Sequence, residues 1–288
     1  MSDEVEKLKT VYEHLWSAHR GEEYEMLDRS LNPRPPEMLY GLVEKLKPAI
    51  DSVALDVGCG KGNHTCELAR RFGFRVEGID PLEGNLEIAR RAAAEQDLIE
   101  RVSFTKGSME SIPFEDASFD LVWSRDMLVH VGDLRRGFEE CGRVLKPVGH
   151  ALVFTTFATE RMEPKEAARL YDALGMEPEN LSASYVEGCL RDGGWQIVSR
   201  EVVGSELMQY YEERDGRCSR ELMRLARMMS AGEKFVAEMG EANYQVTSAL
   251  YHWVIYQLIG KLSSVIYTLK KTDAGQGGGA SGSSGGAM

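Results

Sequence analysis

A short stretch near position 55 constrains the fold of this chain more than any other feature. Residues 53–57 (VALDV) form a Val-rich apolar run, which is typical of a strand buried on both faces of a parallel sheet. Gly58, Gly60 and Gly62 follow, and residues 63–72 (NHTCELARRF) have the pattern of a helix. A strand, a glycine-rich turn and a helix N-terminus place backbone N–H groups at the carboxyl edge of a parallel sheet, where α/β proteins bind ligands.

Three interpretations of this turn are open: a dinucleotide site, an S-adenosylmethionine site, or an ordinary turn without a ligand. The dinucleotide fingerprint GxGxxG requires glycine at position 63, which here is Asn63. The segment DVGCGKG (residues 56–62) instead resembles the cofactor loop of class I S-adenosylmethionine-dependent methyltransferases. That cofactor has no pyrophosphate, but its ammonium group can interact with a nearby carboxylate. The resemblance implies that the cofactor contacts Asp56, Gly58, Cys59 and Gly60.

A second acidic residue follows the next predicted strand, residues 75–79. This strand ends at Asp80-Pro81, about twenty residues beyond the glycine loop, where a carboxylate can accept hydrogen bonds from both ribose hydroxyls of an adenosine ligand. Asp-Pro is also common in plain turns. With the glycine loop at this distance, we predict that Asp80 and Pro81 belong to the cofactor site.

The third predicted strand, residues 102–106, leads into a loop that contains Ser108 and Met109. In the family an aspartate often stands at the position of Ser108 and bonds the adenine amino group, so serine makes this contact weaker. The resemblance implies that Met109 packs against adenine. The segment from residue 113 to 122, PFxxxSFDLV in outline, also resembles the family and includes the start of a fourth, central strand.

The segment SRDMLVH, residues 124–130, follows that central strand and resembles phosphoethanolamine N-methyltransferases. The resemblance implies that Arg125 lines the cofactor site, that Asp126 lies near the substrate and that His130 takes part in catalysis. Asp126 and His130 are four positions apart, so one helical turn would place both on one face. Imidazole titrates near neutral pH, so His130 is the predicted general base. A purely structural contact of His130 is the alternative.

The resemblance extends from about residue 53 to residue 156 and includes the block RVLKPVGHALVF. Further strands are predicted over residues 149–155, 195–203 and 264–270. The fold class that follows is α/β, with a doubly wound, seven-stranded and mostly parallel sheet, that is, a Rossmann-like methyltransferase fold.

We predict five parts of the chain: N-terminal lid helices in residues 1–50, a cofactor-binding core in 51–204, a helical cap insertion in 205–260, the last strand in 261–272 and a Gly/Ser-rich tag or linker in 273–288. Helices are expected over residues 4–19 and 37–46, with a polar turn after the first of them. From their position in the lid segment, His19 and Tyr24 are expected to contact the substrate.

Composition excludes several other classes. The net charge is −12 and no cluster of Lys and Arg occurs, which argues against nucleic acid as a partner. Five widely spaced cysteines without a CxxC pair predict reduced thiols in a cytoplasmic protein rather than disulfides or a zinc site, and no metal is expected. The longest apolar stretch, residues 249–260, is too short to span a membrane. Homo-oligomerisation stays open.

These features predict an S-adenosylmethionine-dependent methyltransferase of small-molecule metabolism that acts on a nitrogen, oxygen or activated carbon, with His130 as general base. A non-catalytic cofactor-binding protein that kept the fold is the main alternative, and a nucleotide-dependent oxidoreductase is disfavoured by Asn63. The acceptor stays open as well. Asp126 and the acidic balance favour an amine, whereas the Met- and Tyr-rich cap favours a larger aromatic or terpenoid molecule.

Overall fold

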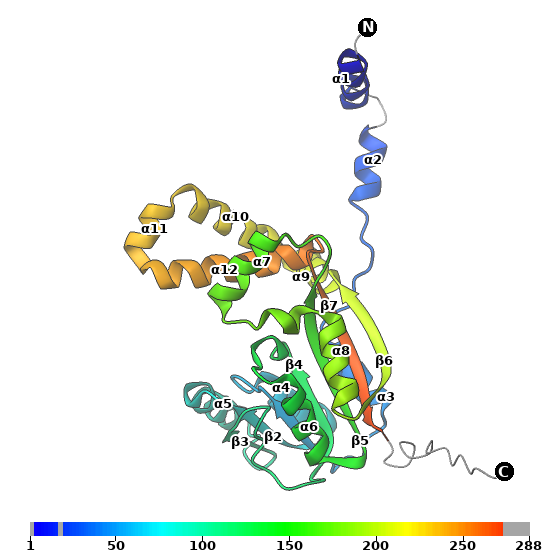
Figure 1. Cartoon of the computed structure of the whole chain (residues 1–288), viewed down its shortest axis with the longest axis vertical. Coiled ribbons are helices and arrows are strands. Elements are labelled where there is room, and N and C mark those ends of the chain that lie inside the picture. Colours follow the sequence, from blue (N-terminus) through cyan, green and yellow to red (C-terminus); the bar gives the residue numbers. More distant parts are fainter. Residues whose placement is uncertain (1–2, 17–19, 273–288) are drawn as a thin grey trace, which may run out of the picture.

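The computed structural model describes residues 3–16 and 20–272, and its centre is a seven-stranded sheet (Figure 1). Across the sheet the strand order is β3-β2-β1-β4-β5-β7-β6, with β7 antiparallel to both of its neighbours. The predicted fold class is confirmed. The strands are β1 (Val53–Val57), β2 (Arg75–Asp80), β3 (Val102–Lys106), β4 (Phe119–Arg125), β5 (Leu145–Ala158), β6 (Trp195–Gly204) and β7 (Leu262–Lys271).

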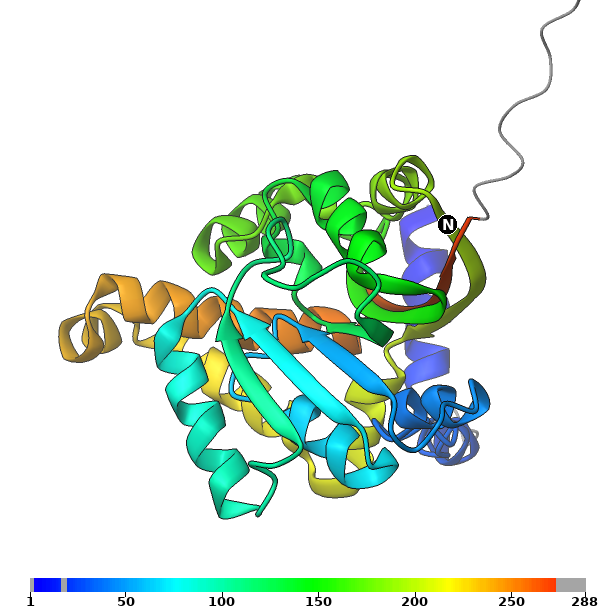
Figure 2. The same ribbon diagram turned by 90° about the horizontal axis from the view of Figure 1, so that it is seen from below.

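Helices cover both faces of this sheet (Figure 2). On one face pack α3 (Met38–Lys45), α4 (Asn63–Phe72) and α5 (Glu83–Glu95), and on the other α6 (Leu134–Val144) and α8 (Ala183–Asp192). Neighbouring strand residues alternate between the two hydrophobic clusters, as period-two geometry requires. Both faces are therefore buried, which explains the continuous apolar runs of the central strands.

The chain reverses its direction of travel across the sheet at β1. From β1 it proceeds outward through β2 to β3, and then returns to β4 on the other side of β1. This arrangement opens a crevice at the carboxyl ends of β1 and β4. The backbone N–H groups of Gly58 and Cys59 both donate to the carbonyl of Ile79, at 2.8 and 2.9 Å, and so fix the glycine loop beside the end of β2.

Four helices connect β6 to β7: α9 (Glu206–Asp215), α10 (Arg217–Ser230), α11 (Gly232–Met239) and α12 (Glu241–Leu258). They extend to one side of the sheet and pack on α7 (Pro164–Leu174), where Leu170 and Ala249 share a small hydrophobic cluster (Figure 1). We call these four helices the cap. Within the described ranges, no helix is long and apolar enough to cross a membrane.

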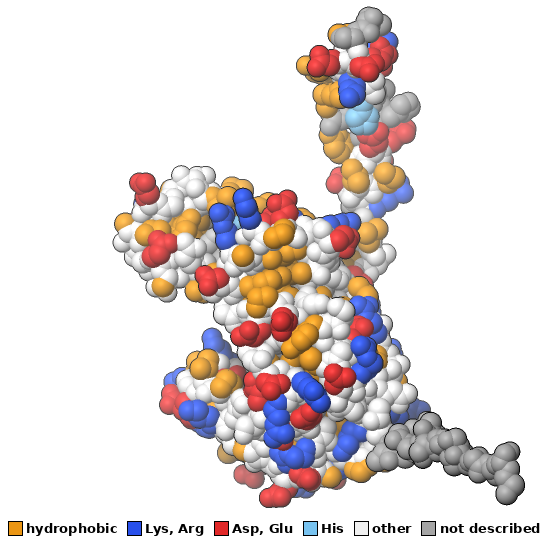
Figure 3. All heavy atoms as spheres, in the orientation of Figure 1, with side chains coloured by type: hydrophobic (Ala, Val, Ile, Leu, Met, Phe, Trp, Pro, Cys, Tyr) orange, Lys and Arg blue, Asp and Glu red, His pale blue; other side chains and the backbone are white. Residues whose placement is uncertain are grey.

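The first two helices, α1 (Asp3–Leu15) and α2 (Arg20–Leu27), project away from this body (Figure 1). No side chain of α1 is buried, and hydrophobic side chains are exposed on both helices, including Leu8 and Leu27 (Figure 3). The polar turn predicted after the first helix is wrong, because residues 20–27 are helical. Their glutamates, methionine and leucine are good helix formers.

The extended segment between α2 and α3 is fastened to the cap by Arg34. Its guanidinium donates to both carboxylate oxygens of Glu206, at 2.7 and 2.9 Å, and to Glu201 at 3.1 Å. Glu206 opens α9 and Glu201 lies on β6, so Arg34 ties the N-terminal segment to the base of the cap.

Candidate cofactor and catalytic site

A cavity of about 400 Å³ lies at the carboxyl ends of β1, β2, β3 and β4. This volume lies within the range of small-molecule sites. Six residues selected from the sequence line it: Gly58, Asp80, Pro81, Ser108, Met109 and His130. The structure therefore brings together side chains that are up to 72 positions apart in the chain.

The glycine loop contributes Gly58 to the lining of the cavity, and its glycines have a left-handed backbone conformation. Gly58 has φ +73°, and a Cβ there would lie 2.7 Å from the Met127 side chain. Gly60 has φ +52°, but no heavy atom lies within 4 Å of where its Cβ would be. Gly60 does not line the cavity, but its backbone borders open space, which a closely bound ligand could use.

Asp80 is 7% exposed and its carboxylate is held by three donors. One oxygen accepts from the backbone N–H of Gly60 at 3.0 Å. The other accepts from the backbone N–H of Leu82 at 3.0 Å and from the Asn85 amide at 3.1 Å. These bonds fix the carboxylate at the cavity that it lines and leave one lone pair, on Oδ2, for a ligand.

Asp56 lies beneath the loop rather than in the cavity wall. It is 2% exposed and accepts a 2.6 Å hydrogen bond from the Thr65 hydroxyl in the first turn of α4. Burial raises the pKa of Asp56 to about 7, against the opposing effect of the Thr65 hydrogen bond. In this geometry Asp56 connects β1 to α4. The neighbouring Cys59 is also buried and does not line the cavity.

The predicted helical pairing of Asp126 and His130 is wrong. Asp126 has φ +56°, and the only helix in this segment is a 3₁₀ turn, η1 (Leu128–His130), which begins after it. Asp126 is 46% exposed at its side chain and pairs with Arg125, whose Nε lies 3.4 Å from its Oδ2. The two residues therefore leave β4 together, without the shared helical face.

His130 lines the cavity and is oriented by the end of α7. Its Nδ1 lies 3.0 Å from the carbonyl oxygen of Gly175. A carbonyl can only accept, so Nδ1 carries the hydrogen, and in the neutral ring Nε2 is the bare nitrogen. This tautomer is the one in which His130 can take a proton through Nε2.

Two residues that the sequence did not point to, His64 and Tyr40, form a hydrogen-bonded series with Arg125, and none of the three lines the cavity. His64, in the first turn of α4, contacts Arg125 through Nε2 at 2.7 Å and the Tyr40 hydroxyl through Nδ1 at 2.6 Å. Burial, and then the charge of Arg125, lowers the pKa of His64 to about 4. The position of His64 directly after the glycine loop was the available signal.

Of the two residues expected to contact the substrate, one can be placed relative to this cavity. Tyr24 lies on α2 with 51% of its surface exposed and does not line the cavity. His19 lies outside the described residues. In the described part of the chain, no group of three or more His, Cys, Asp or Glu side chains could hold a metal ion.

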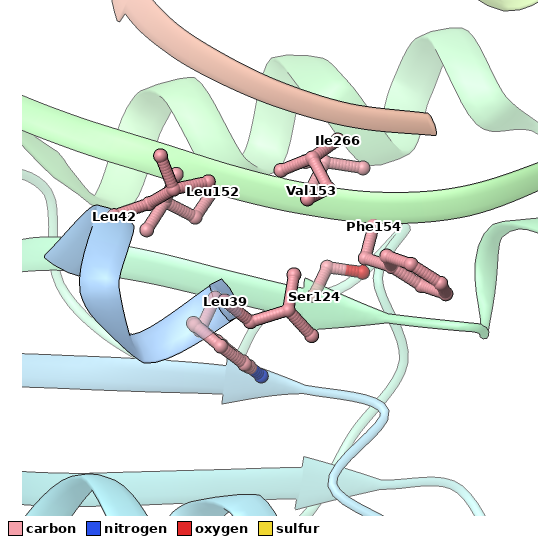
Figure 4. A pocket seen from close by; sticks show the side chains of 8 residues that line it. Leu39, Leu42, Ser124, Leu152, Val153, Phe154 and Ile266 are labelled. Carbon is pink, nitrogen blue, oxygen red and sulfur yellow. The ribbon is translucent and has the colours of Figure 1, made fainter. Parts of the chain in front are cut away.

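Two other hollows differ from this cavity. An apolar space between α3 and the sheet, lined by Leu39, Leu42 and Phe154 among others, is too small for a water molecule (Figure 4). A larger cavity of about 770 Å³ lies between α7 and the cap and mixes aromatic residues with charges of both signs.

The comparison with known families identifies the central part of the chain. Residues 55–153 match the family model described as a methyltransferase domain, and this segment contains the glycine loop, Asp80 and His130. The chain carries a class I S-adenosylmethionine-dependent methyltransferase domain. The predicted family and its cofactor, S-adenosylmethionine, are confirmed.

Relatives of this methyltransferase domain include N-methyltransferases that are named for sarcosine and dimethylglycine. A sarcosine/dimethylglycine N-methyltransferase of Halorhodospira halochloris is 27% identical over 83% of this chain and 81% of its own length. A sarcosine/dimethylglycine N-methyltransferase of Aphanothece halophytica is 30% identical over 54% of this chain and 56% of its own length. A glycine/sarcosine/dimethylglycine N-methyltransferase of Actinopolyspora halophila is 29% identical, and the match spans 60% of this chain but only 31% of that protein.

Solved structures show the same fold. Phosphoethanolamine N-methyltransferase 2 of Haemonchus contortus, in complex with phosphomonomethylethanolamine and S-adenosylhomocysteine, aligns with TM-score 0.64 at 19% identity over 85% of this chain and 54% of that one. The [4+2]-cyclase SpnF aligns with TM-score 0.64 at 22% identity over 82% and 81%. Since a cyclase shares the fold, the reaction has to be argued from the site.

Proposed function

We propose that this protein transfers the methyl group of S-adenosylmethionine to a nitrogen, oxygen or activated carbon of a small molecule, with His130 as the general base. The observation that carries the proposal is the convergence of the glycine loop, Asp80 and His130 on one cavity. The glycine loop and the Asp80 carboxylate can bind the cofactor, and the His130 imidazole can remove a proton from the methyl acceptor.

The residues around the cavity fit the parts of the cofactor. Asp80 offers its Oδ2 to a ribose hydroxyl, Ser108 and Met109 form the wall for adenine, and the open backbone at Gly60, next to the cavity, leaves room for an amino-acid moiety. When bound, the cofactor supplies an electrophilic methyl group on a positively charged sulfur. The chain's own contribution is therefore alignment and exclusion of water.

His130 contributes a positioned proton acceptor. The carbonyl of Gly175 holds the Nδ1–H, so Nε2 is the nitrogen able to remove a proton from an attacking amine or hydroxyl. A positioned base accelerates such a step by roughly 10²–10⁴-fold. Asp126 lies four residues earlier and is partly exposed, so it can attract a cationic substrate group.

Among acceptors, an amine is the first candidate. The relatives named above methylate the amines of glycine, sarcosine or dimethylglycine according to their names. An acidic side chain beside the site and a net charge of −12 also suit a cation. Other relatives are named as an O-methyltransferase of Penicillium expansum and a sterol 24-C-methyltransferase of Pneumocystis carinii, so hydroxyl and carbon acceptors belong in the screen.

The test combines an acceptor screen with variants of His130. With the best acceptor from pooled amines, phenols and indoles, His130→Asn should lose most of kcat and keep its affinity for S-adenosylhomocysteine. Asparagine retains an N–H near the position of Nδ1 for the Gly175 carbonyl but has no basic nitrogen. His150→Asn is the matched control, because His150 lies on β5 and does not line the cavity. Near-normal turnover of folded His130→Asn would eliminate the general-base role.

A non-catalytic cofactor-binding protein is the second candidate, and the methyltransferase-like fold of a cyclase is the observation that keeps it open. It predicts tight binding of S-adenosylhomocysteine by the wild type and no formation of S-adenosylhomocysteine from S-adenosylmethionine with any acceptor pool. Cofactor turnover with even one pool excludes it.

A further inference from the structure

Three hydrogen-bonded side chains, here called the Tyr40–His64–Arg125 network, connect α3 through α4 to the end of β4. The Tyr40 hydroxyl lies 2.6 Å from Nδ1 of His64, and Nε2 of the same ring lies 2.7 Å from Nη1 of Arg125. The three residues belong to three elements and are 24 and 61 positions apart along the chain. Their alignment therefore depends on how α3 and α4 pack on the sheet.

The proton positions in this network follow from which atoms can donate and which can accept a hydrogen bond. A guanidinium can only donate, so His64 Nε2 must be the acceptor of the Arg125 N–H. A neutral imidazole has one N–H, which must then lie on Nδ1 and donate to the Tyr40 oxygen. Protonation of His64 would remove the acceptor and place two cations 2.7 Å apart. Burial and the Arg125 charge, which lower the pKa of His64 to about 4, keep the ring neutral near pH 7.

Packing against aromatic rings fixes both ends of the network, Tyr40 and Arg125. The Tyr40 ring stacks on Trp123 of β4 with centroids 5.5 Å apart, and the guanidinium of Arg71 lies 4.5 Å from its centroid. At the other end the Arg125 guanidinium lies 5.4 Å from the Phe154 ring centroid. Figure 4 shows Phe154 across from Leu39 of α3, around the apolar space that holds no water. His64 is thus held between rigid partners.

Arg125 keeps one amino group for a ligand. Its Nε faces Asp126 and its Nη1 bonds His64, while within the described residues Nη2 has no hydrogen-bond partner. Val57 pairs with Ser124 across β1 and β4, so Arg125 follows directly beside Gly58, which lines the cavity.

The cofactor presents one anionic group that matches this position. In the proposed binding mode Asp80, Ser108 and Met109 hold the adenosine part at the ends of β2 and β3, so the methionine part would extend toward β1 and β4. That part carries an α-carboxylate. The cavity is lined by the acidic side chains of Asp80 and Glu110 and by no Lys or Arg, so a charged partner for the carboxylate would have to come from a residue next to the lining set.

We infer that His64 and Tyr40 are positioning residues that hold the Arg125 guanidinium so that Nη2 binds the carboxylate of the cofactor's methionine moiety. The inference rests on the proposed function for the identity of the ligand. It requires no methyl acceptor and can therefore be tested by binding alone.

Two ligands separate this interaction from the rest of the site. S-adenosylhomocysteine contains the amino-acid moiety, whereas 5′-methylthioadenosine contains the adenosine and thioether parts without it. By calorimetric titration, His64→Phe should weaken S-adenosylhomocysteine binding by about tenfold and leave 5′-methylthioadenosine binding unchanged, because only the charged contact is lost. Arg125→Met should do the same to at least the same extent.

Conservative variants identify the bond that matters. His64→Gln can present its amide oxygen near the position of Nε2, so it should restore affinity for S-adenosylhomocysteine to within about threefold of the wild type. His64→Asn reaches only the position of Nδ1 and should behave like His64→Phe. Tyr40→Phe removes the oxygen that accepts from Nδ1 and should give a weaker loss, again restricted to S-adenosylhomocysteine.

The outcomes are distinct from those that test the proposed function. If the wild type binds neither ligand, the cofactor assignment fails and the inference fails with it. If the wild type binds both and folded His64→Phe binds S-adenosylhomocysteine normally, the inference alone is overturned. An equal loss for both ligands also overturns it, since a general distortion of the pocket would then explain the effect. If His64→Phe does not fold, His64→Gln and His64→Asn decide the question instead. Equal affinities of these two variants for S-adenosylhomocysteine would overturn the inference.

Discussion

Asp80 combines two tasks at the edge of the cofactor cavity. Its carboxylate accepts hydrogen bonds from the loop at Gly60 and from the start of α5, through Leu82 and Asn85. The same side chain lines the cavity. A substitution therefore acts on the loop and on the ligand, and a useful experiment has to separate the two effects.

We expect Asp80→Ala to weaken binding of S-adenosylhomocysteine by about 1–3 kcal/mol, because buried ribose hydroxyls would lose a charged acceptor. Calorimetry measures the affinity. Asp120→Ala is the control, since Asp120 also holds a backbone N–H, that of Val53, but at the opposite end of the sheet. Asp120→Ala should lower the melting temperature without changing the affinity. Unchanged affinity in Asp80→Ala would contradict the ribose assignment.

His64 makes stability depend on pH in a definite direction. Its folded pKa of about 4 lies below its unfolded value of about 6.5, so the unfolded state binds more protons between these values. The neutral ring stabilises the fold fully above pH 6.5, and this contribution is lost as the pH falls toward 4. Asp56, with a raised pKa of about 7, has the opposite sign over an overlapping range.

The difference between wild type and His64→Gln cancels the effect of Asp56. We expect this difference in unfolding free energy to shift against the wild type by up to about 3 kcal/mol between about pH 7 and about pH 4. Denaturant titrations at several pH values measure it. A difference that does not change with pH would show that His64 titrates normally in the folded protein.

At the residue scale, the sequence predicted the parts of the site that follow from local motifs. The glycine loop, Asp80, Ser108, Met109 and His130 each follow a strand, so their place at the sheet edge follows from strand order alone. The link between His64, Tyr40 and Arg125 was not predictable, because it requires α3 to pack against α4, and periodicity does not specify that contact. Likewise, four-residue spacing placed Asp126 on a helix that starts only at Leu128.

At the scale of elements, strand boundaries were harder to predict than the number of strands. The fifth strand was expected over residues 149–155, whereas β5 covers Leu145–Ala158. Pro147 was interpreted as the end of the preceding helix, so the strand was expected to begin only at Gly149. A register shift between Phe119 and Leu121 of β4 instead lets the irregular start of β5 pair with it, and proline is tolerated where the ladder is interrupted.

The glycine loop and the end of β6 offer a matched pair of substitutions. Gly60 and Gly204 have φ of +52° and +57°, and at neither position does a heavy atom lie within 4 Å of where an added Cβ would be. Each change to alanine should cost roughly 1 kcal/mol of stability from the left-handed conformation. Only Gly60→Ala should also weaken S-adenosylhomocysteine binding, by at least about tenfold, because only Gly60 adjoins the proposed cofactor site, through its bond to Asp80. Equal affinities in the two variants would place the ligand elsewhere.

At the scale of the whole molecule, two additions surround the methyltransferase core. The cap follows β6, and the N-terminal helices precede β1. Arg34 joins them, since it bonds Glu206 at the start of α9. The functions of these additions as cap and lid stay predictions, and the family model covers neither of them, because it matches only residues 55–153.

The N-terminal helices allow a test of the lid prediction. Since α1 buries no side chain, deletion of residues 1–27 should leave the melting temperature within about 2 °C of the wild type and leave S-adenosylhomocysteine affinity unchanged. If α1 and α2 close over bound substrate, their exposed apolar residues such as Leu8 and Leu27 become covered, and the deletion should raise KM or lower kcat about tenfold or more. Arg34 remains in the shortened chain, so its bond to Glu206 is not part of the loss. Turnover equal to that of the full chain would remove the lid prediction, and a large drop in melting temperature would show that these helices pack on the body in solution.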